Sequence, residues 1–162
     1  PIEITGLLVV GNRGKYMKAH FGMVDFDHDL AVLRLPPDTP EEIIAQENAE
    51  GLEIVDKYPD VGEKVSYAGF PLGTRLLNST HAPTYSEGVV GAQLRDQKLK
   101  KQIQITGVVV GGFSGAPITL ANESHKIIGV LSNSPSKEAG EANIFMGISW
   151  EHVKKIAELA HS

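Results

Sequence analysis

The chain contains no cysteine, so no disulfide stabilises it. This absence does not fix a compartment, because many periplasmic proteins also lack disulfides. No apolar run is long enough to cross a membrane, and no signal peptide is visible. Acidic residues outnumber basic ones and give a net charge of −5, which argues against nucleic acid as the main partner. With a hydrophobic fraction of 41%, the composition is that of an ordinary soluble globular protein.

The length of 162 residues suits one compact unit or two small barrels that share an interface. Internal repeats and low-complexity segments are absent from the sequence. One basic run, Lys98 to Lys101 after Arg95, is expected to form a solvent-exposed hairpin loop. A specific anionic partner at this run is the less favoured alternative.

Alternating apolar residues predict a mostly β chain with a few helical interruptions. A first hairpin is expected from Ile2–Val10 and Tyr16–Val24. The next strand, Leu30–Leu35, should end at the following prolines. Thr39 is expected to cap a short helix that begins at Pro40 and runs to about residue 48.

A second group of strands is expected in the remainder of the chain. They are Lys64–Gly69, Glu87–Leu94, Gln102–Val110, Ala116–Leu120 and Ile127–Leu131. Ser149 is a good N-cap for a final helix over Trp150–Ala160, whose apolar residues recur at helical spacing. This helix is expected to be a structural lid on the barrel.

The most informative segment reads Gly-Gly-Phe-Ser-Gly-Ala-Pro from Gly111 to Pro117. Glycine permits positive φ angles, so these residues can form a tight turn that presents Ser114 as a nucleophile. The pattern is not the nucleophile elbow of α/β-hydrolases, because a β-like segment follows the turn instead of a helix. The N–H groups of Gly112 and Ser114 are candidates to bind a developing oxyanion. A plain β-turn is the alternative that this motif alone leaves open.

Four further segments accompany the serine turn in a consistent order along the chain. They are the acidic cluster ending at Asp29 before the strand Leu30–Leu35, then Val61–Gly73, Ile127–Ser132 and Ile144–Ser149. Together with the serine turn, these segments resemble the trypsin/chymotrypsin clan, and in particular the HtrA-like bacterial trypsin-like proteases. The resemblance covers nearly the whole chain. The lack of cysteine fits bacterial or archaeal relatives better than disulfide-stabilised vertebrate trypsins.

The resemblance implies an all-β fold, a chymotrypsin-like double β-barrel with an incomplete first barrel and a C-terminal helix. Residues 1–60 would hold the remainder of the first barrel and a helical linker. Residues 61–162 would hold the second barrel and the closing helix. The implied activity is that of a serine endopeptidase that cleaves polypeptide substrates and needs neither cofactor nor metal.

The same resemblance assigns roles to individual residues. Ser114 would attack the peptide carbonyl, and Asp29 would orient the histidine of a Ser-His-Asp triad. Gly112 and Ser114 would form the oxyanion hole through their N–H groups. The implied substrate-binding residues precede and follow the serine turn: Val108, Val109, Val110, Gly111, Val130, Leu131 and Ser132. Because none of these is acidic, we expect a small or medium aliphatic P1 residue and not arginine or lysine.

The triad histidine has no matching position in this sequence. In the family it lies upstream of the aspartate after an early strand, so it is expected before Pro1, outside the sequence given. His20 and His28 are the alternatives within the chain. His20 lies in mid-strand, and His28 is expected to point away from Asp29 because the segment should be extended. His20 with the nearby aspartates 25, 27 and 29 could instead hold a metal, although their spacing matches no compact motif.

Phe113 departs from the family pattern, in which aspartate or asparagine precedes the serine. This departure predicts an oxyanion loop that rests in an inactive arrangement until something binds. Two other functions stay open. One is a pseudoprotease that keeps the fold for peptide binding, and the other is a non-enzymatic β-domain that binds a partner by strand addition. The sequence leaves homo-oligomer formation and compartment open, with a periplasmic or secreted bacterial or archaeal protein as the expectation.

Overall fold

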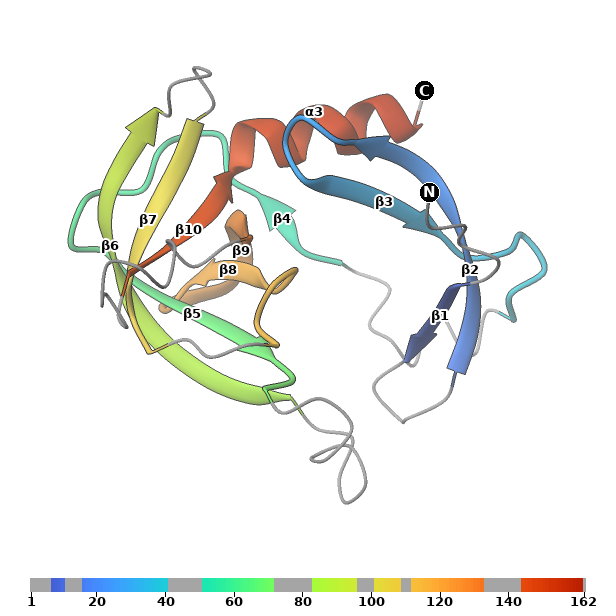
Figure 1. Cartoon of the computed structure of the whole chain (residues 1–162), viewed down its shortest axis with the longest axis horizontal. Coiled ribbons are helices and arrows are strands. Elements are labelled where there is room, and N and C mark those ends of the chain that lie inside the picture. The colour runs from blue at the N-terminus through green and yellow to red at the C-terminus, as the bar shows by residue number, and fades with distance from the viewer. Residues whose placement is uncertain are drawn as a thin grey trace. The chain divides into compact units, whose positions relative to one another are not determined.

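The computed structural model describes residues 7–10, 16–40, 51–71, 83–95, 101–108, 112–132 and 144–161. The chain divides into two compact units, Pro1–Gly51 with Ile156–Ser162, and Leu52–Lys155. Figure 1 labels the strands and the helix of both units. The helix expected to begin at Pro40 falls outside the described residues, and the boundary expected at residue 60 stays a prediction.

The first unit contains a three-stranded antiparallel sheet in the order β1-β2-β3. Its strands are β1 (Leu7–Val10), β2 (Tyr16–Asp25) and β3 (Leu30–Arg34). β1 and β2 form the predicted hairpin, with Val10 opposite Tyr16. β2 and β3 pair with a register shift between Phe21 and Met23. The extra residue, Gly22, leaves room for the side chain of Arg34, which a Cβ at that position would approach to 3.0 Å.

One face of this sheet is apolar and exposed. Phe21 pairs with Leu33, and Val24 pairs with Ala31, so cross-strand pairing and the two-residue repeat put all four on the same face. The side chains of Phe21, Val24 and Leu33 are 46%, 40% and 43% exposed. On the opposite face Leu30 is buried. Apolar sheet faces are normally packed against other elements, so the exposed face has the character of a core surface.

The second unit is a closed antiparallel barrel (Figure 1). Its strands run in the order β10-β7-β6-β5-β8-β9, and β10 also pairs with β9, which closes the ring. They are β5 (Lys64–Gly69), β6 (Thr84–Arg95), β7 (Lys101–Gly107), β8 (Pro117–Leu120), β9 (Glu123–Leu131) and β10 (Ile144–Ser149). Closure removes the free edges that an open sheet would present, so every barrel strand has two neighbours.

The predicted second group of strands agrees with β5 to β9, apart from their ends. Two strands were missed. β4 (Glu53–Ile54) pairs in parallel with β9 on the outside of the ring, and it is too short to show an alternating pattern. β10 was expected only as a segment leading into the helix, although its pairing closes the barrel.

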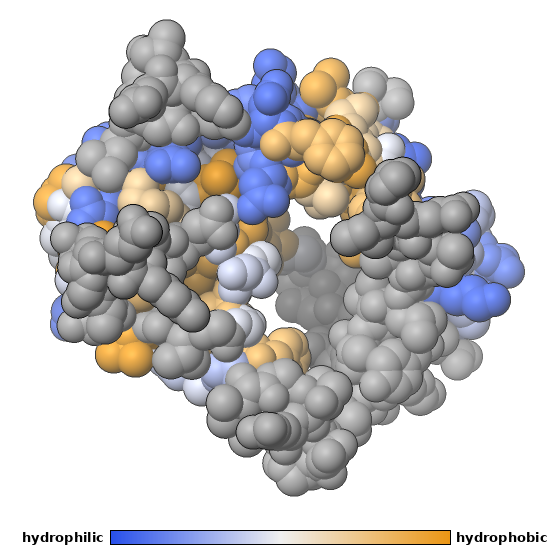
Figure 2. Space-filling view, viewed as in Figure 1, coloured by the Kyte–Doolittle hydropathy of each residue, from blue (hydrophilic) through white to orange (hydrophobic). Residues whose placement is uncertain are grey.

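The barrel interior holds the main hydrophobic core. Its buried members are Val55, Val65, Tyr67, Val90, Ile103, Ile105, Phe113, Ala116, Ile118, Leu120, Ile128, Leu131 and Phe145. Tyr67 is central to it and makes edge-on ring contacts with Phe113 and Phe145 at centroid distances of 5.5 and 6.4 Å. The Tyr67 hydroxyl donates to the carbonyl of Val108 at 2.9 Å, so its one polar group is satisfied. On the outer surface, apolar and hydrophilic residues are interspersed in the view of Figure 2.

The helix α3 (Trp150–His161) begins where it was predicted to begin. Ser149 directly precedes it but does not cap it, because its buried hydroxyl has no hydrogen-bond partner. The first turn is attached to the barrel in other ways. Trp150 packs against the core and meets the ring of Tyr58 edge-on at 5.6 Å. Among the described residues, no helix has the length and apolar character needed to span a bilayer.

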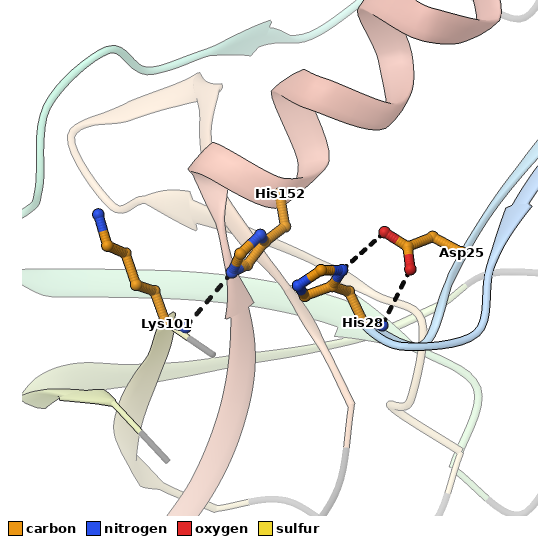
Figure 3. Close-up of polar contacts among 4 residues, drawn as sticks. All are labelled: Asp25, His28, Lys101 and His152. Carbon is orange, nitrogen blue, oxygen red and sulfur yellow. Dashed lines mark hydrogen bonds and ion pairs between the residues drawn. The ribbon is translucent and has the colours of Figure 1, made fainter. Parts of the chain in front are cut away.

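Lys101, the first residue of β7, contacts the first turn of α3. Its ammonium lies 2.7 Å from a carboxylate oxygen of Glu151. Its backbone N–H donates to Nε2 of His152 at 3.3 Å, as Figure 3 shows. The hydrogen bond with Glu151 raises the pKa of Lys101. Partial burial acts to raise the pKa of Glu151, but the interactions with Lys101, Tyr58 and His152 together outweigh it and hold that pKa below its ordinary value. Lys101 was expected in a solvent-exposed loop, and the structure places it in a strand with an acidic partner.

Replacing Lys101 by Met removes the ammonium and keeps an aliphatic side chain. We expect a small fall in Tm near neutral pH, because partly exposed ion pairs contribute little. The stability that comes from Glu151 is present above its ordinary pKa of 4.5 and is lost as pH falls through the lower folded value. Thermal unfolding from about pH 7 to about pH 3 should therefore show the gap between the two proteins closing in acid. A gap that stays constant down to the lowest pH would contradict this assignment.

Candidate active site

Ser114 lies in a tight turn that leads into β8. The N–H of Ala116 donates to the carbonyl of Phe113 at 2.9 Å, which closes a four-residue turn with Ser114 and Gly115 at its centre. Gly115 has a φ of 87°, as the third position of a type II turn requires. The predicted strand–turn–strand context of the serine is confirmed where the structure describes it, and Ser114 is exposed at the turn.

The N-terminal end of this turn is fixed by Gly112. Its φ of 106° lies in the region that favours glycine. Its carbonyl accepts a hydrogen bond from the N–H of Phe70 at 3.1 Å. A Cβ at Gly112 would clash with the carbonyl oxygen of Phe70 and lie 2.8 Å from Cα of Pro71. The close approach of these two backbones therefore depends on glycine.

Phe113 anchors the turn in the barrel core. Its side chain is buried and packs edge-on against Tyr67. A Cβ at Gly69 would lie 2.8 Å from the Phe113 ring, so the glycine at the end of β5 makes room for it. The residue that departs from the family pattern thus has a packing role. The inactive resting arrangement expected from it stays a prediction.

The C-terminal end of the turn is fixed to β9. The N–H of Gly115 donates to the carbonyl of Leu131 at 2.7 Å, and the N–H of Leu131 donates to the carbonyl of Ala116 at 2.9 Å. The side chain of Leu131 is buried in the core. Leu131 was expected to line the substrate site, but its side chain packs in the core and its backbone N–H and carbonyl are both bonded to the turn.

The nucleophile candidate and its neighbouring amides are available for chemistry. The Ser114 hydroxyl donates to the carbonyl of Ser132 at 2.9 Å. Within the described segments, the N–H groups of Gly112 and Ser114 donate to no acceptor. Two unpaired backbone donors that flank a serine on an exposed turn are the groups that an oxyanion would need.

The other residues expected to bind substrate are only partly described. Val109, Val110 and Gly111 lie outside the described residues. The side chain of Val108 is 67% exposed, and its carbonyl accepts hydrogen bonds from Tyr67 and Ser86. Val130 and Ser132 are half-buried. The structure therefore brings Ser132 to Ser114 by a hydrogen bond and shows no such contact for Val108 or Val130.

Asp29 belongs to the first unit and directly precedes β3, as predicted. It is exposed and has a φ of 54°, a left-handed conformation that aspartate adopts more readily than most residues. The segment from Phe26 to Asp29 is a turn. The expectation that His28 and Asp29 lie in an extended segment is therefore wrong, and alternation along a strand does not decide where His28 points.

His28 is paired with Asp25 (Figure 3). Its Nδ1 lies 2.7 Å from one carboxylate oxygen of Asp25, and its backbone N–H donates to the other at 3.2 Å. Partial burial acts to raise the pKa of Asp25, but these hydrogen bonds outweigh it and lower the pKa. His20 is exposed on β2, opposite Arg34. In the part of the chain that is described, no group of three or more acidic, histidine or cysteine side chains is arranged to hold a metal.

Sequence reasoning missed the part played by Gly69, Phe70 and Pro71. These residues were noted only as part of a segment that opens the second barrel. The structure places them against Gly112 and Phe113. The glycine-proline spacing gave a signal for a turn, but nothing in it indicates which distant backbone the turn contacts.

Comparison with known proteins settles the family. The sequence matches the trypsin-like peptidase domain over residues 4–130. The chain belongs to the trypsin-like peptidase domain family. This confirms the resemblance predicted from the serine turn and its accompanying segments. No curated protein matches the sequence of this trypsin-like peptidase domain.

Solved structures with the same fold are HtrA-type and related proteases. The HtrA-type protease AlgW with a decapeptide matches 96% of this chain with a TM-score of 0.74 and 20% identity. The Rv3671c protease from M. tuberculosis in its active form matches 88% with a TM-score of 0.64 and 18% identity. The matches span 44% and 58% of those two chains, so this chain covers less than two thirds of either. The predicted all-β chymotrypsin-like fold, with its closed barrel and C-terminal helix, is confirmed.

Two alanine variants of this trypsin-like peptidase domain test how the turn is held. Gly115→Ala adds a methyl group where no atom lies within 4 Å, so its cost is the positive φ alone, about 1 kcal/mol. Gly112→Ala carries the same kind of cost and must also displace the backbone of Phe70 and Pro71. We expect the larger fall in the free energy of unfolding for Gly112→Ala, measured by denaturant titration. Equal losses for the two variants would show that the contact with Phe70 is not tight.

Proposed function

We propose that the chain is the catalytic part of a serine endopeptidase, with Ser114 as the nucleophile. The observation that carries the proposal is the exposed Ser114 turn, which is fixed at both ends and whose Gly112 and Ser114 N–H groups donate to no acceptor among the described residues. Family membership supports peptidase chemistry. A serine hydroxyl beside two such backbone donors suits acyl transfer, because negative charge develops on the attacked carbonyl oxygen near those donors.

The reaction would follow the triad scheme. A histidine takes the proton of the Ser114 hydroxyl as the oxygen attacks the peptide carbonyl, and it later donates that proton to the leaving amine. Asp29 orients the imidazole and stabilises its charged form. The N–H groups of Gly112 and Ser114 hold the oxyanion, each worth about 3 to 4 kcal/mol in comparable sites. The hydrogen bond from Ser114 to the carbonyl of Ser132 must break as the base takes over.

We infer that the histidine comes from a segment that precedes Pro1 and packs on the first sheet. The exposed apolar face formed by Phe21, Val24 and Leu33 supports this inference, because further strands of the first barrel would bury it. With His28 as the base instead, Asp25 would take the place of Asp29 as the orienting acid, because Asp25 holds the Nδ1 and the backbone N–H of His28.

The proposed substrates are polypeptides. The solved AlgW structure contains a decapeptide, which is a property of that protein and supports the same class of ligand here. Val130 lies in β9 and Ser132 directly follows it, where its carbonyl accepts the hydrogen bond from Ser114. Neither residue carries a negative charge. We therefore keep a small or medium aliphatic P1 residue as the proposed preference.

Covalent labelling tests the nucleophile. In the protein extended by its natural upstream residues, a fluorophosphonate should add to Ser114, and Ser114→Ala should abolish the adduct. Peptide mapping by mass spectrometry locates the modified residue. Labelling of the extended protein but not of the 162-residue chain would place the base upstream. Absence of labelling in both would contradict the endopeptidase and favour a pseudoprotease that binds peptides without cleaving them.

Asp27, two residues before Asp29, provides a matched control for a test of Asp29 as the triad acid. Asp29→Asn should lower kcat by about 10⁴-fold, because the imidazole loses the partner that fixes its tautomer. Asp27→Asn removes the same charge from an exposed position in the same turn and should leave kcat close to that of the parent. Peptide hydrolysis by the extended protein provides the measurement. Similar kcat values for the two variants would reject Asp29 as the triad member.

A further inference from the structure

We propose that the side chain of Phe70 forms an apolar subsite for the leaving-group side of the substrate. This inference rests on the proposed endopeptidase function. Phe70 directly follows β5, and its side chain is 39% exposed although it is a large apolar group. Its backbone N–H is bonded to the carbonyl of Gly112, one of the two residues proposed to hold the oxyanion. The Phe70 ring is therefore partly exposed to solvent, while the Phe70 backbone is bonded to the Ser114 turn.

The way the Ser114 turn is fixed indicates which part of the substrate Phe70 would meet. The C-terminal end of the turn is attached to Leu131, and the Ser114 hydroxyl contacts the carbonyl of Ser132. Val130, Leu131 and Ser132, which are among the residues assigned to the acyl side, lie at this end, and the others so assigned directly precede Gly112. The N-terminal end is attached to Phe70 through Gly112. Phe70 belongs to neither group of acyl-side residues, and a peptide attacked at Ser114 also extends beyond the scissile bond, so we assign Phe70 to the residues on that side.

The surroundings of Phe70 suit an apolar side chain. Tyr85 on β6 pairs with Ala68 on β5, two residues before Phe70, so it lies on the strand beside the one that leads into Phe70. Tyr85 is 61% exposed, and its hydroxyl donates to Glu87, which leaves its ring as a second apolar surface. The backbone that carries Phe70 is held in place, because Gly112 fits against its carbonyl and Pro71 is buried.

Two internally quenched peptides test the subsite. They share one sequence and differ only in the two residues after the scissile bond, which are leucine in one and glycine in the other. The extended wild-type protein should cleave the leucine peptide with a kcat/KM roughly tenfold higher than that for the glycine peptide, because the leucine side chains bury a few more methylene groups in the transition state. Phe70→Ala and Phe70→Gln should bring the ratio close to one, and Phe70→Leu should retain most of it.

Val61→Ala is the control, because Val61 is another exposed apolar residue of the same unit and precedes the opposite end of β5. It should keep the wild-type ratio. An unchanged ratio in the folded Phe70→Ala or Phe70→Gln protein would overturn the subsite, and fluorophosphonate labelling of Ser114 in that protein would show that the endopeptidase proposal still stands. If the wild-type protein neither cleaves the peptides nor labels, both the subsite and the proposed function fall.

Discussion

The contact between Gly112 and the backbone of Phe70 and Pro71 is the constraint on which the proposed site depends. Two segments far apart in the sequence meet there with no space for a side chain. The contact fixes the carbonyl of Gly112 and with it the peptide plane from Gly112 to Phe113, which lies between the two peptides that carry the proposed donors. The donors needed for catalysis are backbone groups, so their positions are set by such close packing and not by side-chain rotamers.

The closed barrel makes this contact rigid. Phe113 inserts into the core beside Tyr67, and Gly115 is bonded to β9, so the turn is attached to the barrel at three points. Protein interiors are packed densely, and a displacement of Phe113 would disturb its neighbours. The exposed Ser114 is thus preceded by Phe113, which is anchored in the core, and followed by Gly115, which is bonded to β9. This arrangement explains how an aromatic residue can replace the polar residue that is usual before the serine.

The sequence predicted the barrel strands β5 to β9, the final helix and the serine turn, because alternation, glycine and proline act locally. It could not predict β4, which is held only by pairing with β9. It also could not predict the ion pair of Lys101 with Glu151, or the packing of Gly112 on Phe70, because both join residues distant in the sequence. At Ser149 the sequence predicted a helix cap that the structure does not form. A good capping residue stands at the right position, but tertiary packing buries its hydroxyl without a partner.

The central claim is that the N–H groups of Gly112 and Ser114 are held ready to bind an oxyanion. The most direct measurement is the backbone amide NMR spectrum of the extended protein before and after addition of an aliphatic peptide boronic acid, whose adduct on Ser114 would mimic the tetrahedral intermediate. The account predicts large downfield shifts for the amide protons of Gly112 and Ser114. The amide of Gly115, which already donates to Leu131, should shift little. A boronate adduct that left the Gly112 and Ser114 amides unshifted would contradict it.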